Sequence, residues 1–299
     1  MSRELSGLRG GMWAALAAVA AIAMTVAGCG KSEPPGSAAL RCYVGGTMKP
    51  PMEELARLYQ EKTGKQVDLD FGDSGENFIK AEQTGRGDLY VAHDPFHGMV
   101  AHKGMSTGAW VVAILRPVIA VAKGNPKEIH GFKDLAKPGL RVIFTDAQYS
   151  TAGHLVAVML KKVGPEVADA IEKNIVSRTR QGGQAANAVV LGTADAAIVW
   201  QAVVLLRSDK LDAVPIEPEF MPQAGVDAVT SPTFGRIDMG SIRVTIDVLR
   251  SSTQPATARE FAEFVASPDQ WPVWEKLGFD PPPGPRRLED EGAAGSNPE

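Results

Sequence analysis

The chain contains little cysteine, with only Cys29 and Cys42 among its 299 residues. Two cysteines allow at most one disulfide, so a network of disulfides cannot hold the fold together. Cys42 lies in a short apolar stretch, where a lone cysteine is typical of a small core residue. We therefore predict a fold stabilised by a hydrophobic core, with no catalytic or metal-binding role for Cys42.

The chain also lacks an excess of positive charge. It has 31 Lys and Arg and 35 Asp and Glu, which gives a net charge of −4. Without a basic stripe, nucleic acid is not a predicted partner. The chain has neither the P-loop of an ATPase nor the G-x-S-x-G turn of a hydrolase. The spacing of His93 and His97 is a weak zinc-like pattern without a third strong ligand, so we assign this segment a surface or hinge role. No cofactor and no metal are predicted.

The N-terminus has the pattern of a bacterial export signal. Arg3 and Arg9 precede the apolar stretch 12–27, which ends in Val-Ala-Gly before Cys29. This stretch is too short to span a bilayer comfortably, and no second apolar run approaches that length. Small residues directly before a cysteine resemble a lipobox, which predicts a lipoprotein signal peptide over 1–28 and lipidation of Cys29. The alternative is an ordinary signal peptide followed by a chance cysteine.

Two further segments have compositions that do not favour a packed core. Residues 29–39 are rich in Gly, Ser and Pro, which predicts a flexible tether. Residues 281–299 carry almost no apolar side chains, which predicts a disordered tail. The folded body therefore extends from about Leu40 to Phe279.

Strand and helix patterns alternate through this body, which predicts an α/β fold with parallel strands. The pattern runs through one α/β unit, begins again after residue 139, and ends with a strand at 242–248 and two helices. We therefore predict two lobes: 40–115 as the first part of lobe 1, 116–225 as lobe 2, and 226–280 as the return to lobe 1. The predicted strands are 40–44, 66–71, 89–92, 140–145, 196–200 and 242–248, and the predicted helices are 51–63, 76–84, 152–163, 165–174, 185–191, 257–266 and 269–277.

Four turns combine glycine with a hydroxyl or amide side chain at the start of a helix. They are Gly45–Thr47, Gly72–Gly75, Tyr149–Gly153 and Gln181–Gln184. Helix N-termini present free N–H groups and suit anions, and in open α/β sheets such turns gather where ligands bind. The alternative is that Thr47, Ser74 and Thr151 serve only as helix N-caps.

Several segments resemble the periplasmic molybdate-binding proteins of ABC importers. Residues 40–100 contain YVGGT, TGKQV, GDSGE and GDLYV at the places of the family's Ala-Ala-Ser-Leu, "TG…V", "SSG" and "G…AD" motifs. DLAKPGLRVIFTDAQYSTAGH, GTADAAIVWQA and FAEFVASPDQWPVWEKLGF match later family segments. The resemblance implies the two-lobed, type 2 periplasmic binding protein fold, with the ligand cleft between the lobes.

The resemblance also implies a set of ligand-binding residues. The family's oxyanion ligands fall on Thr47, Ser74, Ala152, Gly182 (or the adjacent Gly183) and Trp200. Trp200 replaces a tyrosine, so it offers an indole N–H in place of a hydroxyl. Asp73 is a second departure, because a carboxylate facing the cleft would repel a dianion. We predict that Asp73 caps its own helix, with Glu76 three residues on; otherwise it selects a protonated or cationic ligand.

The resemblance thus implies a lipid-anchored, monomeric solute-binding component of an ABC importer on the periplasmic side of the cell envelope. It would bind molybdate or tungstate and contact a permease. Binding of another small solute (phosphate-like, organic anion or metal) is an alternative. An enzyme on the same scaffold is a further one, for which Asp73 and His154 are the only titratable pair that the sequence suggests.

The lipobox is tested by Cys29→Ala in a chain expressed with its signal. The variant lacks the thiol that would be acylated, so we expect it to leave the membrane fraction, unlike a matched Cys42→Ala control. Fractionation and intact mass measure both outcomes. An acylated, cleaved Cys29→Ala protein in the membrane fraction would contradict the prediction.

Overall fold

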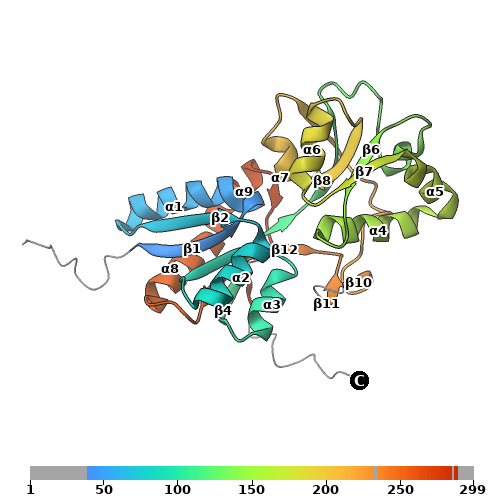
Figure 1. The fold of residues 1–299 in the computed structure, drawn as a ribbon. Helices are drawn as coiled ribbons and strands as arrows, with labels where there is room; N and C mark the ends of the chain where they lie inside the picture. Colours follow the sequence, from blue (N-terminus) through green and yellow to red (C-terminus); the bar gives the residue numbers. More distant parts are fainter. Residues whose placement is uncertain (1–38, 232–234, 285, 289–299) are drawn as a thin grey trace, which may run out of the picture. The chain divides into compact units, whose positions relative to one another are not determined.

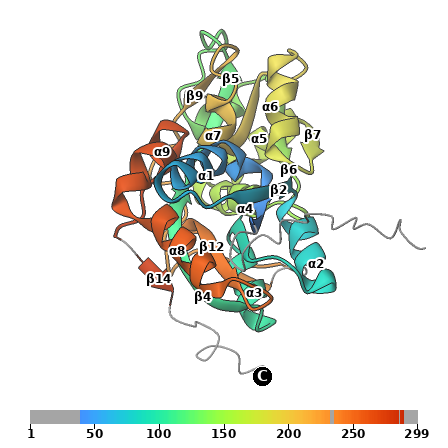
Figure 2. The same ribbon diagram turned by 90° about the vertical axis from the view of Figure 1, so that its left-hand side faces the viewer.

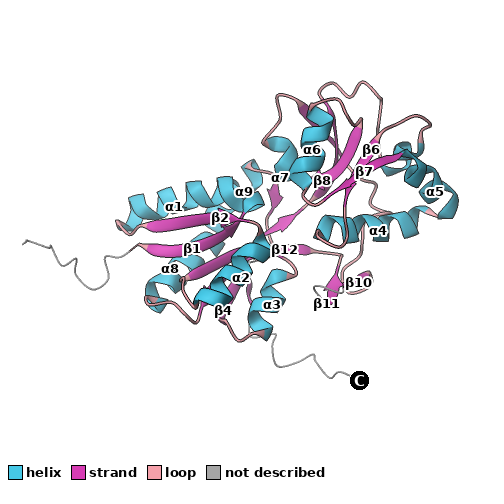
Figure 3. Ribbon diagram, viewed as in Figure 1, coloured by secondary structure: helices cyan, strands magenta, loops and turns pink. Residues whose placement is uncertain are grey.

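The computed structural model describes residues 39–231, 235–284 and 286–288. The predicted signal peptide, lipidated Cys29, nearly all of the tether and the chain end beyond Leu288 lie outside these residues. Within the described ranges, none of the helices is both long and apolar enough to cross a membrane. Figure 1 shows the order of the elements along the chain, and Figure 3 shows that helices and strands alternate through most of it.

The first sheet contains the N-terminal strands and receives the chain again near its C-terminus. Its order is β13-β4-β12-β3-β1-β2, and β14 also pairs with β4. β1 is parallel to β2 and β3, whereas β12 is antiparallel to β3 and β4. The strands are β1 (Leu40–Gly45), β2 (Val67–Gly72), β3 (Leu89–His93), β4 (Ser106–Leu115), β12 (Ile242–Leu249), β13 (Phe279–Asp280) and β14 (Arg286–Leu288).

Five α-helices belong to the described residues of this part of the chain. They are α1 (Lys49–Thr63), α2 (Ser74–Thr84), α3 (Phe96–His102), α8 (Pro255–Ala266) and α9 (Trp271–Lys276). α1 packs against α9, and α8 contacts β4 and β12 (Figure 2). α1 has prolines in its first turn and ends at Gly64, whose φ of 72° is the left-handed conformation that glycine adopts readily.

The second sheet has the order β7-β6-β8-β5-β9. Its strands are β5 (Pro117–Ala122), β6 (Val142–Thr145), β7 (Ile175–Thr179), β8 (Ala196–Trp200) and β9 (Leu211–Val214). Its helices are α4 (Thr151–Val163), α5 (Pro165–Asn174), α6 (Gly182–Val190) and α7 (Gln201–Leu205). β10 (Ala228–Ser231) and β11 (Gly235–Asp238) form a separate antiparallel pair before β12.

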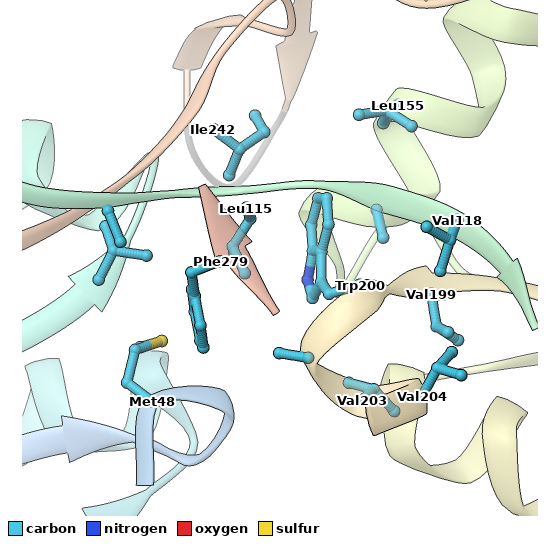
Figure 4. Packing of buried hydrophobic residues seen from close by; sticks show 14 of the residues in the cluster. Met48, Leu115, Val118, Leu155, Val199, Trp200, Val203, Val204, Ile242 and Phe279 are labelled. Atoms are coloured by element: carbon cyan, nitrogen blue, oxygen red, sulfur yellow. The ribbon is translucent and has the colours of Figure 1, made fainter. Parts of the chain in front are cut away.

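The chain changes sheets at Arg116, between β4 and β5. The apolar stretch 110–121 is therefore two strands in different sheets, joined by an exposed arginine. Figure 4 shows Trp200 below this crossover, with Phe279 on one side and Val118 on the other. All three side chains belong to one hydrophobic cluster that includes residues of both sheets.

The prediction of parallel strands holds only in part, because β12 is antiparallel to β3 and β4, and β5 is antiparallel to β8 and β9. The predicted strands also omit β4, β5 and β9. β7 was not predicted, because three of its five residues are exposed and the segment lacks an apolar pattern. The disordered tail predicted over 281–299 is wrong for Arg286–Leu288, which pairs with β4. Leu288 is buried there with Ala109 and Val111. Backbone hydrogen bonds to an available strand edge, with one apolar side chain, order a segment whose composition alone would not.

The pairing of β14 can be tested by Leu288→Ala. Removing a buried leucine side chain should lower the free energy of unfolding by about 2 kcal/mol, at the low end of the usual range because the cluster is small. Urea unfolding measures the change, and Leu191→Ala, at a side chain that is 76% exposed, is the control. Equal effects of the two substitutions would mean that β14 does not stabilise the fold.

Candidate functional site

The first two strands bring Thr47 and Ser74 to the same edge of their sheet. β1 and β2 pair in parallel with Gly45 opposite Gly72, and each polar residue follows its glycine by two positions. A Cβ on Gly45 would overlap Ser74 Oγ, so the glycine permits the two loops to approach closely. Ser74 is buried and Thr47 is half-buried.

None of the three hydroxyl residues acts as a helix N-cap. Thr47 lies inside the 3₁₀ helix Gly46–Met48, and Ser74 and Thr151 are the first helical residues of α2 and α4. The side chains of Thr47 and Ser74 make no hydrogen bond within the described part of the chain, whereas Thr151 Oγ1 donates to the carbonyl oxygen of Asp94 at 3.1 Å. The alternative interpretation of these residues as caps is therefore wrong, and two hydroxyls are left without a partner.

Asp73 caps α2, as predicted. Its carboxylate accepts hydrogen bonds from the backbone N–H groups of Gly75 at 2.9 Å and Glu76 at 3.4 Å. These are two of the N–H groups that a helix start would otherwise offer to an anion. At this helix start, the hydroxyl of Ser74 remains without a partner among the described residues.

A hydrogen bond from Tyr90 fixes the backbone of Ser74. The buried Tyr90 hydroxyl donates to Ser74 O at 2.7 Å. Burial, together with the charges of Asp247 and Asp73, raises the pKa of Tyr90, so the phenol stays protonated and remains a donor. Asn77 Nδ2 also donates to Val44 O at 3.1 Å, which ties α2 to β1.

The second sheet contributes two helix starts and an indole. β6 and β8 are parallel and end at Thr145 and Trp200, and Ala152 is the second residue of α4. Gly182 and Gly183 are the first two residues of α6. N–H groups at these positions have no acceptor within their own helix. A Cβ on Gly182 would lie 3.7 Å from Val199 Cγ1, so sterics do not require glycine there.

His93 and Asp94 connect the two sets of residues, and the sequence interpretation missed this. Asp94 O accepts from Thr151 Oγ1 on α4 and lies 2.7 Å from His93 Nδ1. The rings of His93 and Trp200 are 6.2 Å apart between centroids. The sequence pattern alone predicts a surface or hinge role for this segment. Its position directly after the third predicted strand, at the same sheet edge as Thr47 and Ser74, was the available signal.

Arg243 holds the Asp94 loop against β12. Its backbone N–H and Nε donate to Asp94 Oδ2 at 3.0 and 2.8 Å, and Nη2 donates to Oδ1 at 3.1 Å. This bidentate geometry is the strong form of an ion pair and fixes the orientation of the carboxylate. The Asp94 carbonyl oxygen is thereby positioned to accept the hydrogen bond from Thr151 Oγ1 on α4.

His97 and His93 do not share a hydrogen-bond partner. Its Nδ1 lies 2.8 Å from Asp247 Oδ1 in a buried pair. Among the residues with described positions, no group of three or more His, Cys, Asp and Glu is arranged to hold a metal ion. Within the same residues, no hydrogen bond or ion pair joins Asp73 to His154, the pair considered for an enzyme, and His154 Nε2 is buried without a partner.

A cavity of about 490 Å³ lies near the crossover between the sheets, beside the end of β8. Its lining includes Arg116, Gln201, Ile216 and Met221. It shares no residue with the set implied by the family resemblance, so its size carries no argument about the anion site.

A model of the bacterial extracellular solute-binding protein family matches residues 40–280. The chain belongs to this family. The molybdate-binding protein ModA of Mycobacterium tuberculosis H37Rv is 26% identical over 284 residues, which cover 90% of this chain and 99% of the relative. This match confirms the resemblance to molybdate-binding proteins that the sequence motifs indicated.

Solved structures confirm the two-lobed periplasmic binding protein fold. The periplasmic molybdate-binding protein of Azotobacter vinelandii has a TM-score of 0.63 at 17% identity, covering 81% of this chain and 99% of that chain. The sulfate-binding protein SubI of Mycobacterium tuberculosis H37Rv has a TM-score of 0.62 at 20% identity, covering 81% and 86%. Proteins described as binding different anions therefore share the fold.

The capping contact of Asp73 can be tested through stability. Asp73→Ala removes the acceptor for two backbone N–H groups and should lower the free energy of unfolding by about 1 kcal/mol, whereas Asp73→Asn should be nearly neutral. Denaturant unfolding measures both, with Asp68→Ala, an exposed strand position, as the control. A loss in Asp73→Ala no larger than in Asp68→Ala would contradict the cap.

Proposed function

We propose that this protein is the solute-binding component of an ABC importer and captures a small oxyanion, with molybdate or tungstate as the first candidates. The observation that carries the proposal is the pair of unbonded hydroxyls, Thr47 and Ser74, at the ends of two parallel strands. Both fall where the molybdate-binding family has its serine ligands. The molybdate-binding relative supports the same ligand class.

Neutral donors suit a compact anion of this kind. Hydroxyls and free helix N–H groups stabilise negative charge without a full counter-charge, and the dipoles of α4 and α6 add to the effect. Ala152 and Gly182 would contribute backbone N–H groups, and Trp200 its indole N–H. Trp200 Nε1 makes no hydrogen bond to the described residues, so it is free to donate.

Transport would follow from a change in the separation of the lobes. A ligand that contacts donors on both sheets favours the closed form, which a permease can distinguish from the open one. The protein would act as a monomer, without a cofactor, on the periplasmic side of the cell envelope, tethered through lipid on Cys29.

Binding of a protonated, phosphate-like oxyanion is the second candidate. Asp73 and His93 favour it, because a carboxylate and an unprotonated imidazole nitrogen accept hydrogen bonds and do not donate them. The charge of Asp73 acts to raise the pKa of His93, against the larger lowering by burial.

The proposal is tested by titrating molybdate, tungstate, sulfate and phosphate into the protein by calorimetry. Thr47→Val and Ser74→Ala each remove a hydroxyl donor to the anion, which should cost about 1.5–3 kcal/mol of binding free energy, or roughly 10- to 150-fold in Kd. Thr253→Val and Ser208→Ala, at exposed residues outside the predicted site, are matched controls and should bind as the wild type does.

Two outcomes would contradict the proposal. The first is that none of the four anions binds the wild type. The second is that Thr47→Val and Ser74→Ala fold normally and keep full affinity, which would place the anion elsewhere.

A further inference from the structure

We infer that His93 contacts the ligand, and that the complex holds one proton between His93 Nε2 and an oxygen of the bound anion. The inference rests on the proposed oxyanion function and adds to it a residue outside the set that the family resemblance implies. It also predicts which form of the anion is bound, because that proton must come either from the ligand or from solution.

The position of His93 places it among the candidate ligands from both sheets. It is the last residue of β3, which pairs directly with β1, the strand that leads to Thr47. Its ring lies 6.2 Å from the ring of Trp200 on β8 and 5.9 Å from the ring of Phe96. The next residue, Asp94, accepts the hydrogen bond from Thr151 at the start of α4.

The hydrogen bond to Asp94 determines which ring nitrogen of His93 carries the proton. Nδ1 lies 2.7 Å from the carbonyl oxygen of Asp94. A carbonyl oxygen only accepts, so Nδ1 must be the protonated nitrogen, and Nε2 of the neutral ring is an acceptor. Nε2 has no partner within the described part of the chain, and it is not among the atoms sealed from solvent there. It is therefore open to a ligand.

The free protein keeps this ring neutral. Burial lowers the pKa of His93, and it outweighs the opposite effects of the Asp94 hydrogen bond and of the charges on Asp94 and Asp73. The charged groups around the ring are Asp73 from the start of α2, Asp94 in the adjoining loop, and Arg243 from β12, which is paired with Asp94. Trp200 and Phe96, the aromatic neighbours, carry no charge.

A neutral Nε2 cannot donate to an anion oxygen that lacks hydrogen. An oxyanion with an O–H group, such as hydrogen phosphate, would donate to Nε2 and bring its own proton. A fully deprotonated dianion, such as sulfate or molybdate at neutral pH, would require His93 to take up one proton from solution and donate from Nε2. In each case the contact is one N···H···O bond with one proton, so the source of the proton distinguishes the ligands.

The sign of the pH dependence follows from this linkage. Binding of a deprotonated dianion raises the pKa of His93 in the complex above its lowered value in the free protein. Affinity is then fully present below the pKa of the free protein, and Kd rises by about tenfold per pH unit from there up to the raised pKa of the complex. Hydrogen phosphate brings its proton and should show no such uptake.

Calorimetry with molybdate, sulfate and phosphate tests the inference, using buffers of different ionisation enthalpy between about pH 6 and about pH 8. We expect the wild type to take up protons, up to one per molybdate or sulfate bound. Phosphate should cause no uptake at the upper end of this pH range, where hydrogen phosphate is already the main free form. His93→Gln, whose amide does not titrate, should abolish both the proton uptake and the change of Kd with pH. His102→Gln, at an exposed histidine of α3, is the matched control and should retain both.

The outcomes separate this inference from the proposed function. Binding of molybdate or sulfate to the wild type without proton uptake, or uptake that persists in a folded His93→Gln, would overturn the role of His93 and leave the oxyanion function standing. If no anion binds, both fail. If His93→Gln does not fold, the His93 ring resonances of the wild type with and without molybdate decide, and a ring whose protonation does not change on binding would overturn the inference.

Discussion

Asp94 is the residue on which the arrangement of the candidate site depends. Its carboxylate is held by three hydrogen bonds from Arg243 on β12, and its carbonyl accepts from Thr151 on α4. A single loop residue is therefore attached to the strand that returns from the second sheet and to the helix start that follows β6. Charge-assisted, bidentate bonds are strong enough to fix this geometry where the chain has no regular structure. His93 is oriented by the same carbonyl.

Only some of the potential hydrogen-bond donors of the candidate site are free to bind a ligand. Thr47 and Ser74 have hydroxyls without partners, whereas two N–H groups at the start of α2 are already bonded to Asp73. A helix start that is neutralised by its own carboxylate attracts a second anion less strongly than a free one. Selection among oxyanions of similar shape would then depend on how many protons the anion carries.

A buried polar network supports this edge of the first sheet. The Tyr90 hydroxyl donates to the backbone carbonyl of Ser74. Asp247, which lies opposite Tyr90 on the neighbouring strand, is hydrogen-bonded to His97 and Thr245. Burial alone would lower the pKa of His97, but the hydrogen bond and charge of Asp247 raise it. A buried polar network whose members are paired makes its surroundings rigid, and Tyr90 holds the backbone of Ser74 in this one.

The sequence by itself determined the α/β class, the alternation of elements and the glycine-rich turns, because these depend on local periodicity and on backbone conformations that few residues adopt. Even the capping of α2 by Asp73 was readable, since a cap is a contact between neighbours in the chain. Only the tertiary structure decided the rest. The contact of His93 with Trp200, the Asp94–Arg243 pair and the strand pairing of Leu288 join residues more than 100 positions apart, and no local pattern encodes which distant partner each will meet.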